Sequence, residues 1–463
     1  MRSACVLLGL LIAACSLEPR YRAPPLPVAD AWPMPPDTLA EGEAAAGNVG
    51  WRDFFVDARL QSLIAQALAN NRDLRVAVLN VAHARALYRI QRAQQLPSVE
   101  ATGNFTKQKL PSALSYGAPS SVSQYYEATV GVTAFEIDLF GRVNSLSHAA
   151  LEQYFALEES RRSAQLSLVA EVAVAYLTLA SDRQLQRLAE DTFKSQQDSF
   201  ALIQKLRETG AASGLDLAQA RTTVETARAD AAHYDGNVAQ DIDALTLLAG
   251  SSADPATLPG GLEAEVTGLG APPAGLASAV LLRRPDVLAS EHLLRAANAN
   301  IGAARAAFFP TITLLGDVGS ASAQLSGLFK SGAGTWAFAP QVTVPLFEGG
   351  KLKGNLDAAH ADQGIALAQY EKAIQSGFRE VADALALSSS LVRERQADEA
   401  LVDATGSAYQ LSQQRHKAGR DSYLNVLDSQ RSDYAARQRL IAVRLAEQTN
   451  RVNLYKALGG GWR

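Results

Sequence analysis

The amino-acid sequence predicts an α+β membrane protein with very long helices, four transmembrane β-strands per chain and an internal duplication. Two stretches, Arg142–Glu208 and Lys351–Lys417, lack proline and would form helices on the order of 100 Å long at about 1.5 Å per residue. Four shorter segments alternate apolar and polar side chains, which is the period of a β-strand. Glycine and proline residues of the first half recur in the second half at nearly constant spacing, which indicates a repeat.

Composition limits the class of protein. The chain has 463 residues, of which 48% are hydrophobic and 19% are charged, with a formal net charge of −4. This is too apolar for a disordered chain, and the near-neutral balance argues against a nucleic-acid partner, which requires a basic surface. Both cysteines, Cys5 and Cys15, lie at the amino end, so the body of the chain has no disulfide framework.

Residues 1–14 predict a secretory signal peptide. Arg2 precedes a short apolar stretch, Ala4–Ala14, which is well below the roughly 20 residues that a membrane-spanning helix needs. The sequence LIAAC that ends at Cys15 resembles the bacterial lipobox, which implies a covalent lipid on this cysteine after cleavage. Ser16 at the next position resembles the pattern sent to the outer membrane. The alternative is an ordinary signal peptide with a chance cysteine.

Residues 15–50 predict an extended, lipidated tether. Proline recurs through this segment and prevents a continuous helix. The prolines are Pro19, Pro24, Pro25, Pro27, Pro33, Pro35 and Pro36.

The first copy of the repeat, residues 51–263, predicts a helix, a β-hairpin and two long helices. Leu60–Gln95 is rich in alanine and leucine, which favours a helix, and Pro97 ends it. The hairpin spans 98–138, where alternation assigns two strands of about 9 to 12 residues, enough to cross a bilayer at a steep tilt. The long helices occupy 142–249.

The second copy, residues 264–463, repeats this order with a hairpin at 310–346 and long helices at 351–458. Equivalent residues lie 213 positions apart before the hairpin loops and 209 apart after the hairpins. Equivalent pairs include Asp73 with Asp286, Pro97 with Pro310, Gly103 with Gly316, Gly141 with Gly350, Gly210 with Gly419 and Gly250 with Gly459.

Four strands with one apolar and one polar face cannot remain alone in lipid, because each unsatisfied backbone group at an open edge costs several kcal/mol. Several chains must therefore contribute strands to one closed barrel. Two chains would give eight strands and almost no lumen, whereas three would give twelve and a pore. The predicted function is passage rather than catalysis.

Several motifs carry a resemblance to a known family. They are Leu281–Gly316 (LLRRPDVLASEHLLRAANANIGAARAAFFPTITLLG), Phe135–Arg142 (FEIDLFGR), Pro345–Lys351 (PLFEGGK), Tyr423–Arg431 (YLNVLDSQR) and Ala457–Trp462 (ALGGGW). With the lipobox, they resemble the outer-membrane factor family of TolC-like efflux ducts, in its NodT/OprM-type lipoprotein branch.

This resemblance implies a homotrimer with a 12-stranded barrel in the outer membrane and a coiled-coil helical barrel in the periplasm. It implies a periplasmic adaptor protein and an inner-membrane pump, usually of the resistance-nodulation-division type, as partners, with outer-membrane lipid around the strands. In such a system the chain would be the passive exit for small molecules such as drugs and toxic compounds. It would be no enzyme, and it would hold no cofactor or metal apart from the lipid on Cys15.

The breaks between the long helices, at Gly210 and Gly419, correspond in the resembling family to the periplasmic aperture. Three copies of an acidic residue around a narrow opening would attract cations and could be bridged by basic or phenolic side chains. The candidates are Asp421, Tyr423, Arg420, Arg415 and Arg207. The alternative role for Asp421 is to cap the following helix.

The junctions between strands and helices are further candidate sites. Glycine permits a tight backbone there, and the basic side chains would lie near the inner lipid interface. The residues are Gly141, Arg142, Gly349, Gly350 and Lys351. Trp336 and Phe338 fit an aromatic girdle, with a core position as the alternative. In the motif Arg283–Asp286 we expect Pro285 to begin a helix and Asp286 to favour its first turn.

The sequence motifs give little support for an enzymatic active site or a metal site. The sequence lacks a G-x-S-x-G elbow, an H-E-x-x-H motif and a Walker loop, and its six histidines are scattered singly on helices that we expect to be solvated. Two alternatives to an efflux duct remain open. One is the exit channel of a type I protein-secretion system, and the other is a periplasmic coiled-coil scaffold lipoprotein that does not span the membrane.

Overall fold

The structure is a computed structural model that describes residues 16–32, 49–110, 121–262, 266 and 278–460. The chain forms two compact units, and each takes segments from both halves of the sequence. The first unit holds the described parts of Met1–Pro25, Asn80–Glu158 and Ala289–Tyr370; the second holds those of Leu26–Leu79, Glu159–Leu288 and Glu371–Arg463. The predicted signal peptide and Cys15 lie outside the described residues.

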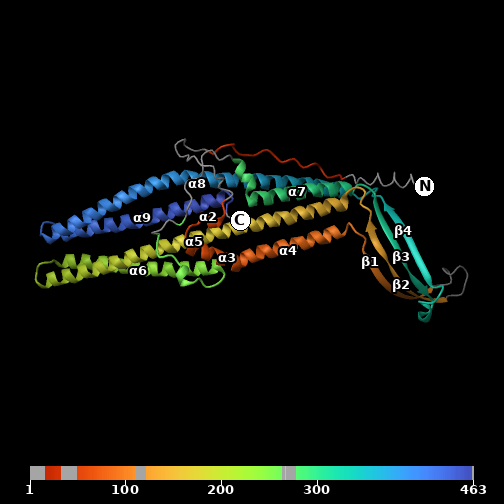
Figure 1. Cartoon of the computed structure of the whole chain (residues 1–463), viewed down its shortest axis with the longest axis horizontal. Coiled ribbons are helices and arrows are strands. Elements are labelled where there is room, and N and C mark those ends of the chain that lie inside the picture. The colour runs from red at the N-terminus through yellow and green to blue at the C-terminus, as the bar shows by residue number, and fades with distance from the viewer. Residues whose placement is uncertain (1–15, 33–48, 111–120, 263–265, 267–277, 461–463) are drawn as a thin grey trace. The chain divides into compact units, whose positions relative to one another are not determined.

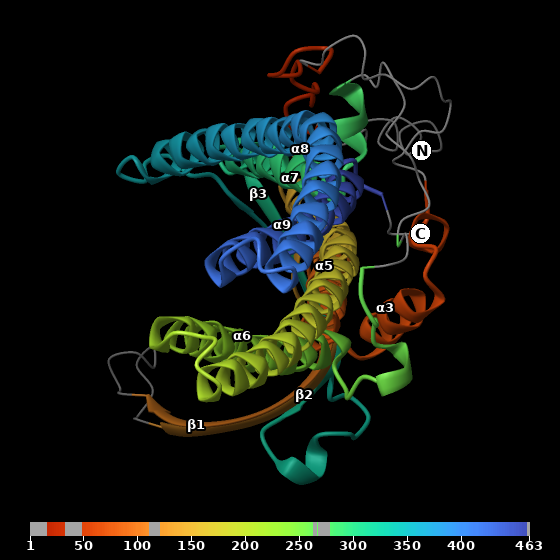
Figure 2. The ribbon, with the colours of Figure 1, turned by 90° about the vertical axis from the view of Figure 1, so that its left-hand side faces the viewer.

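The first unit contains an antiparallel four-stranded sheet (Figures 1 and 2) in the order β1-β2-β3-β4. The strands are β1 (Val99–Leu110), β2 (Ser121–Glu136), β3 (Thr311–Ser322) and β4 (Gly334–Thr343). The pairing of β2 with β3 joins the hairpin of the first half to that of the second. The four strands expected from alternation are therefore present, in one continuous sheet.

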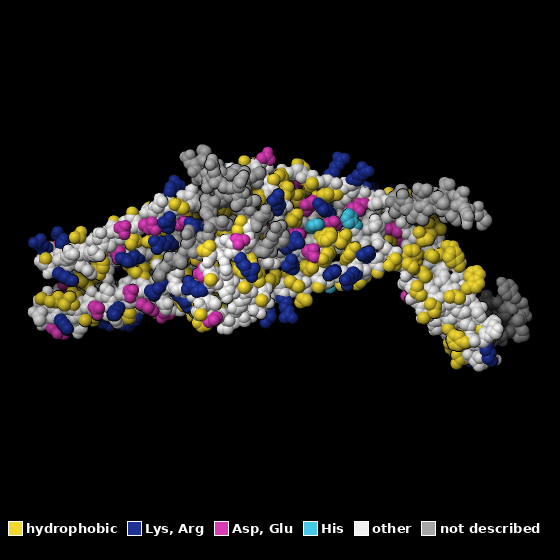
Figure 3. Space-filling view, viewed as in Figure 1, with side chains coloured by type: hydrophobic (Ala, Val, Ile, Leu, Met, Phe, Trp, Pro, Cys, Tyr) yellow, Lys and Arg dark blue, Asp and Glu magenta, His cyan; other side chains and the backbone are white. Residues whose placement is uncertain are grey.

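The pairing registers separate apolar from polar side chains. Directly paired residues lie on the same face of a sheet, and neighbours along a strand lie on opposite faces. Two cross-strand rows are Ala101–Val130–Val318–Trp336 and Thr102–Thr129–Gly319–Thr335. Figure 3 shows hydrophobic side chains gathered over the strands. One face of the sheet is thus suited to lipid and the other to water.

Long helices flank the strands in both halves of the sequence. The helices are α3 (Ala58–Asn70), α4 (Arg72–Ala93), α5 (Arg142–Glu208), α6 (Gly214–Ala249), α7 (Pro285–Ala306), α8 (Lys351–Lys417) and α9 (Tyr423–Ala457), with a short α2 (Trp51–Phe54). By length and composition α5 could cross a membrane, but more than half of its most apolar stretch is buried in the protein. That burial is typical of a core helix.

In the first unit, α5 and α7 pack against each other through small side chains. Ala149 of α5 lies in a buried cluster with Ala296 and Ala299 of α7. Small residues at such a contact let the two helix backbones approach closely.

The second unit has the larger apolar core. Tyr176 and Leu177 of α5 are buried there with Phe55, Leu60 of α3 and Leu245 of α6. The Tyr176 hydroxyl donates a 2.8 Å hydrogen bond to Asp57, so the buried phenol does not lack a partner.

The single helix expected over Leu60–Gln95 is wrong, because the chain breaks at Asn71. The Asn71 backbone is extended (φ −60°, ψ 133°), and its side chain accepts a 2.9 Å hydrogen bond from the Leu74 amide while donating to the Leu248 carbonyl. Asparagine side chains compete with the helix ladder in this way. The helix propensity of the surrounding residues could not reveal this break, since the break depends on the contact of Asn71 with α6.

The Arg283–Asp286 motif forms the start of α7, where Pro285 is the first residue and Asp286 lies in the first turn, as expected. Arg284 is in addition buried, with 7% of its surface exposed. Its guanidinium pairs with Asp286 at 2.7 Å and Glu380 at 2.9 Å and donates to the Ala457 carbonyl at 2.7 Å. One arginine therefore joins α7, α8 and the end of α9.

Candidate functional site

The turns that connect the paired long helices share one geometry. Gly210 between α5 and α6 and Gly419 between α8 and α9 have φ of 74° and 66°, a left-handed conformation that favours glycine. In each turn the glycine amide and the next amide donate back to the preceding helix, at 3.0 and 2.7 Å in the first and 2.8 and 2.9 Å in the second. This is a Schellman motif, which ends a helix without leaving its last carbonyls unpaired.

Asp421 forms a two-point ion pair with Arg415 across the α8–α9 turn. The Arg415 Nε and Nη2 atoms lie 2.6 and 3.0 Å from the two carboxylate oxygens. This hydrogen bond and the nearby charges hold the pKa of Asp421 below its usual value. His416 donates from Nδ1 to the Asp421 carbonyl at 3.0 Å. The carboxylate is therefore ionised and held by its own chain.

The other residues expected to contact Asp421 do not bind its carboxylate. Tyr423 is buried in an apolar cluster with Ile203 and Leu427, and its hydroxyl has no hydrogen-bond partner among the described residues. Burial, with the nearby charges, raises the pKa of Tyr423 to about 12. Arg207 lies on the other turn, beside Gly214, and the ion pair that the structure gives Asp421 is with Arg415 rather than with Arg207 or Arg420.

The capping role considered for Asp421 is wrong, because Ser422 is the residue that precedes α9 and the Asp421 carboxylate binds Arg415. The other turn does contain a reciprocal cap, which was not expected from the sequence. Ser213 and Asp216 exchange side-chain and backbone hydrogen bonds of 2.9 and 3.1 Å at the start of α6. The S-x-x-D spacing is the signal that could have predicted it.

The strand–helix junctions have the geometry that glycine permits. Gly141, Gly349 and Gly350 have φ of 74°, 58° and 90°. Arg142 forms a two-point ion pair with Glu136 at the end of β2, and its Nε–Oε1 distance is 2.9 Å.

Lys351 pairs more loosely with Glu348 at 3.3 Å. Each basic residue at a junction is thus paired with an acidic residue of the same chain segment.

Trp336 and Phe338 of β4 lie on the apolar face of the sheet. They are 77% and 63% exposed in the protomer, so the alternative that they belong to a core is wrong for the single chain. Exposed aromatic side chains on the lipid-facing side of a strand are typical of an interfacial girdle.

The amino-terminal segment 16–25 binds along α5 and α7 in the first unit. Asn298 donates to the Pro19 carbonyl at 2.7 Å, and Arg305 lies within 3.4 Å of the Leu17 carbonyl. Tyr21 donates to Glu291 at 3.1 Å. Cys15 itself lies outside the described residues, but Leu17, two residues later, approaches the end of α7.

All six histidines were expected to be solvated singly, and this is wrong for His148 and His292, which pair with glutamates. His148 Nδ1 lies 3.0 Å from Glu18, and its Nε2 lies 3.4 Å from Glu152. His292 Nδ1 lies 2.6 Å from Glu152 on the other helix. Burial alone would raise the pKa of Glu152, but the hydrogen bond and charge of His292, with the charges of Arg295 and His148, lower it overall.

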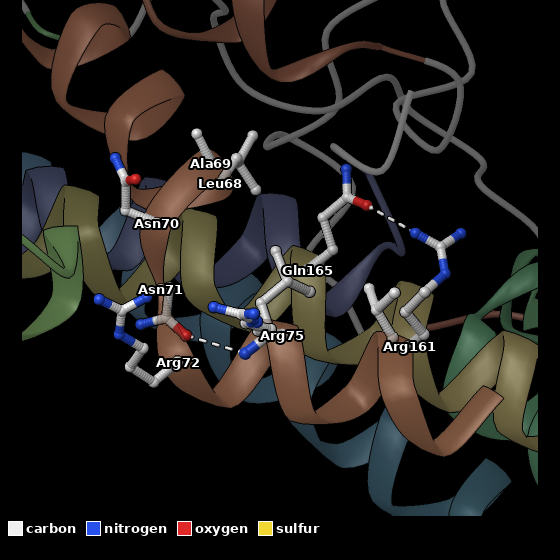
Figure 4. Close-up of a pocket in the computed structure, with 10 residues that line it drawn as sticks. Leu68, Ala69, Asn70, Asn71, Arg72, Arg75, Arg161 and Gln165 are labelled. Carbon is white, nitrogen blue, oxygen red and sulfur yellow. Dashed lines mark hydrogen bonds between the residues drawn. The ribbon is translucent and has the colours of Figure 1, made fainter. Parts of the chain in front are cut away.

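The described residues form ion pairs and packing contacts, and the following arrangements bear on metal binding and catalysis. Within the described ranges, no group of three or more His, Cys, Asp or Glu side chains is arranged so that it could hold a metal ion. A pocket at the α3–α4 break (Figure 4) is lined by Arg72, Arg75, Arg161 and Gln165 with apolar neighbours. It offers cations and amides but no acid–base pair, so its lining does not resemble a catalytic centre.

Comparisons with known proteins agree with this arrangement. The profile of the family described as "Outer membrane efflux protein" matches residues 63–251 and 276–460. The antibiotic efflux pump outer membrane protein ArpC of Pseudomonas putida is 48% identical over 456 residues, which cover 98% of this chain and 94% of ArpC. The outer membrane protein OprJ of Pseudomonas aeruginosa is 44% identical and is covered over 95% of its length.

Among solved structures, the open state of the MtrE outer membrane channel of Neisseria gonorrhoeae aligns with a TM-score of 0.87 at 39% identity, covering 97% of this chain and 99% of MtrE. A membrane protein from Pseudomonas aeruginosa aligns with a TM-score of 0.90 at 42% identity, covering 97% and 98%. The sheet, the paired helices and the family profile together place this chain in the outer membrane efflux protein family.

Proposed function

We propose that this chain is the outer-membrane exit duct of a tripartite efflux system and conducts small molecules passively. The observation that carries the proposal is the four-stranded sheet, which has one apolar face and one polar face, and in which the outer edges of β1 and β4 are unpaired within the described residues. In lipid such edges must be paired, and three copies supply the twelve strands of a closed, water-filled barrel. The energy for transport would come from a pump in the inner membrane, through a periplasmic adaptor.

The names of the relatives support small molecules as the cargo. ArpC is described as part of an antibiotic efflux pump, and TtgC of Pseudomonas putida as part of a toluene efflux pump. The polar face of the sheet carries threonine, acidic and amide side chains, among them Thr129, Glu127 and Asp317, and a lumen with this general polar lining is suited to varied drugs and toxic compounds.

We further propose that Cys15 carries the lipid anchor. Leu17 is held at Arg305, next to the end of α7 and six residues before β3 begins. Two residues reach about 7 Å, so a lipid on Cys15 would lie close to the base of the strands, where acyl chains can enter the inner leaflet. Replacing Cys15 with Ser should abolish labelling by radioactive palmitate, and persistent labelling would refute the anchor.

The aperture proposal rests on Asp421 and Arg415. Three Asp421–Arg415 pairs at the α8–α9 turns would ring the periplasmic opening, and loosening these turns would widen it. Because the Arg415 side chain is exposed to solvent, the pair contributes position and charge rather than much stability.

Reconstitution tests the proposed function. Purified protein in a planar bilayer should show low conductance, and Asp421→Ala should raise it, because the turn loses its bidentate link. Arg228→Ala, which breaks an exposed ion pair with Glu225 within α6, is the matched control and should leave conductance unchanged. An absence of conductance in all three proteins would contradict the duct.

A further inference from the structure

His148 of α5 faces carboxylates with both of its ring nitrogens. Its Nδ1 atom lies 3.1 and 3.0 Å from the two carboxylate oxygens of Glu18, in the amino-terminal segment 16–25. Its Nε2 atom lies 3.4 Å from Glu152, one turn further along α5. The Glu152 carboxylate also binds Nδ1 of His292 on α7 at 2.6 Å. One imidazole therefore connects the amino-terminal segment to the contact between α5 and α7.

These contacts require the charged form of His148. An ionised carboxylate only accepts hydrogen bonds, whereas a neutral imidazole has one N–H donor and one lone pair. A neutral His148 would therefore turn a lone pair toward Glu152 or toward Glu18, depending on which nitrogen keeps the proton. Only the imidazolium form has a donor on each nitrogen. His292 meets one carboxylate among the described residues, and a neutral ring with its proton on Nδ1 satisfies that contact.

The other charged groups around this cluster belong to the segment, α7 and α8. Arg295 and Glu291 of α7 pair at 2.6 Å, and Tyr370 of α8 lies beside them. Tyr21 of the segment donates to Glu291 at 3.1 Å, and burial together with the charge of Glu291 raises the pKa of Tyr21 to about 12. Arginine keeps its proton at all these pH values.

Among the groups of the cluster, the two histidines are therefore those whose side chain ordinarily titrates near neutrality, at about pH 6.5. Burial would raise the pKa of Glu152, but its hydrogen bond to His292 and the surrounding positive charges lower it overall, so its carboxylate stays ionised there. Of the two histidines, His148 is the one whose contacts depend on its second proton.

A glycine of α7 makes room for the segment at Glu18. A Cβ atom added at Gly302 would lie 2.8 Å from the Glu18 Cα atom and 2.8 Å from the Ser145 Oγ atom of α5. The segment backbone thus lies directly on α7 at this point. Hydrogen bonds from α7 to the carbonyls on either side of Glu18 fix the same place, and they involve no group that titrates near neutrality.

We propose that His148 is a proton-dependent latch that holds the amino-terminal segment on α5 and α7. In its charged form it bridges Glu18 and Glu152. When it loses its proton, the attraction between one cation and two carboxylates is lost, and the segment keeps only its other contacts. The latch is therefore closed in mildly acid surroundings and loosens as the pH rises through the range in which imidazole titrates. It uses residues 16–25, α5 and α7, so it operates whether or not Cys15 carries a lipid.

Trypsin can report the release of the segment. Arg20 and Arg22 are exposed on either side of Tyr21, and a protease needs the surrounding backbone to leave α7 before it can cleave there. When opening is fast, the cleavage rate follows the population of the open form. The purified protein in detergent micelles is digested briefly at about pH 6 and about pH 8.5, values that bracket the ordinary titration of histidine. Mass spectrometry measures the loss of the amino-terminal residues.

Each cleavage rate is divided by the rate at which trypsin cleaves a small peptide at the same pH, which removes the pH dependence of the protease. We expect the corrected rate of the wild type to rise about threefold to tenfold between the two pH values, because the lost contact is a charge-assisted hydrogen bond of a partly exposed side chain.

Substitutions of His148 separate charge from shape. His148→Gln has no titrating group, so we expect fast cleavage at both pH values. His148→Arg carries a positive charge at both pH values and can donate to both carboxylates, so we expect slow cleavage at both. His360 is exposed on α8 of the same unit, and His360→Gln is the matched control, which should keep the wild-type pH dependence. Circular dichroism shows whether each variant has the helix content of the wild type.

Gly302→Ala tests the docked position of the segment without changing a titratable group. Its methyl group must push the segment away from α7, so cleavage should become faster at both pH values while the rise between them remains. A Cβ atom at Gly364 of α8 would meet no atom within 4 Å, so Gly364→Ala is the control and should behave as the wild type.

Three results would overturn the latch. The first is a wild-type rate that is equal at the two pH values. The second is an unchanged pH dependence in His148→Gln, and its loss in His292→Gln would then assign the titration to His292. The third is fast cleavage of a folded His148→Arg variant at the higher pH. None of these measurements depends on conductance or on the number of chains in the particle, so failure of the latch leaves the proposed duct intact.

Discussion

Gly319 in β3 offers a sharp test of the sheet geometry. A Cβ atom at this position would lie 2.1 Å from the Ala128 carbonyl oxygen and 2.6 Å from the Thr129 Cα atom of β2. Real Cβ atoms essentially never approach below 3.0 Å, so β2 and β3 would have to separate locally by about 0.9 Å. A Cβ atom added at Gly103 in β1 would meet no atom within 4 Å, which makes Gly103→Ala the matched control.

The magnitude of Gly319→Ala follows from the separation. An N–H···O bond of about 2.9 Å that lengthens by this amount is no longer a hydrogen bond. Loss of two ladder bonds at about 1 kcal/mol each, with overpacking of about 1–3 kcal/mol, destabilises the sheet by about 3–5 kcal/mol. Gly103→Ala should cost less than about 1 kcal/mol.

Two measurements check the prediction. We expect Gly319→Ala to reduce the amount of protein in purified outer membranes and to lower the denaturant midpoint in detergent micelles, with Gly103→Ala close to wild type in both. Equal behaviour of the two alanine variants would refute the close β2–β3 approach on which the reasoning depends.

Three further predictions concern the helices. Arg284→Met should destabilise the second unit by about 2–4 kcal/mol, because the Ala457 carbonyl and two carboxylates lose a buried donor. Arg283 is exposed, so Arg283→Met is the control and should leave stability unchanged. Thermal denaturation of the two variants compares them. Tyr423→Phe should change stability by less than about 0.5 kcal/mol, since the buried hydroxyl has no hydrogen-bond partner among the described residues. A large loss of stability in the same assay would contradict this and show that the hydroxyl is hydrogen-bonded. Glu152→Gln should lower stability at neutral pH. The pKa of Glu152 lies below its ordinary value of 4.5, so the stabilisation by its carboxylate is present above pH 4.5 and is lost as the pH falls through the pKa in the folded protein. The difference in unfolding free energy between wild type and variant should therefore disappear in acid. A difference that stays constant with pH would contradict the ion pair.

Much of the local structure could be predicted from the sequence. The ends of α5 and α8 coincide with Arg142–Glu208 and Lys351–Lys417, because an uninterrupted helix continues until a glycine with positive φ permits the chain to turn. The strands follow from alternation, since a period of two places every apolar side chain on one face.

Side-chain partners could not be predicted in the same way. Arg207, Arg415, Arg420 and Tyr423 all lie close to a helix break in sequence, and only the path of the α8–α9 turn decides that Arg415 reaches Asp421. The helix break at Asn71 and the His148–Glu152–His292 cluster likewise depend on residues far apart in the chain.

The sequence by itself determined the ends of the long helices α5 and α8, the strand faces and the repeat, because these depend on local backbone preference and on periodicity. Only the tertiary structure decided which faces of equivalent helices are buried, which ion pairs form and how β2 meets β3. The physical reason is that two near-identical local patterns acquire different surroundings: α7 finds α5 within the chain, whereas α4 has its equivalent face exposed.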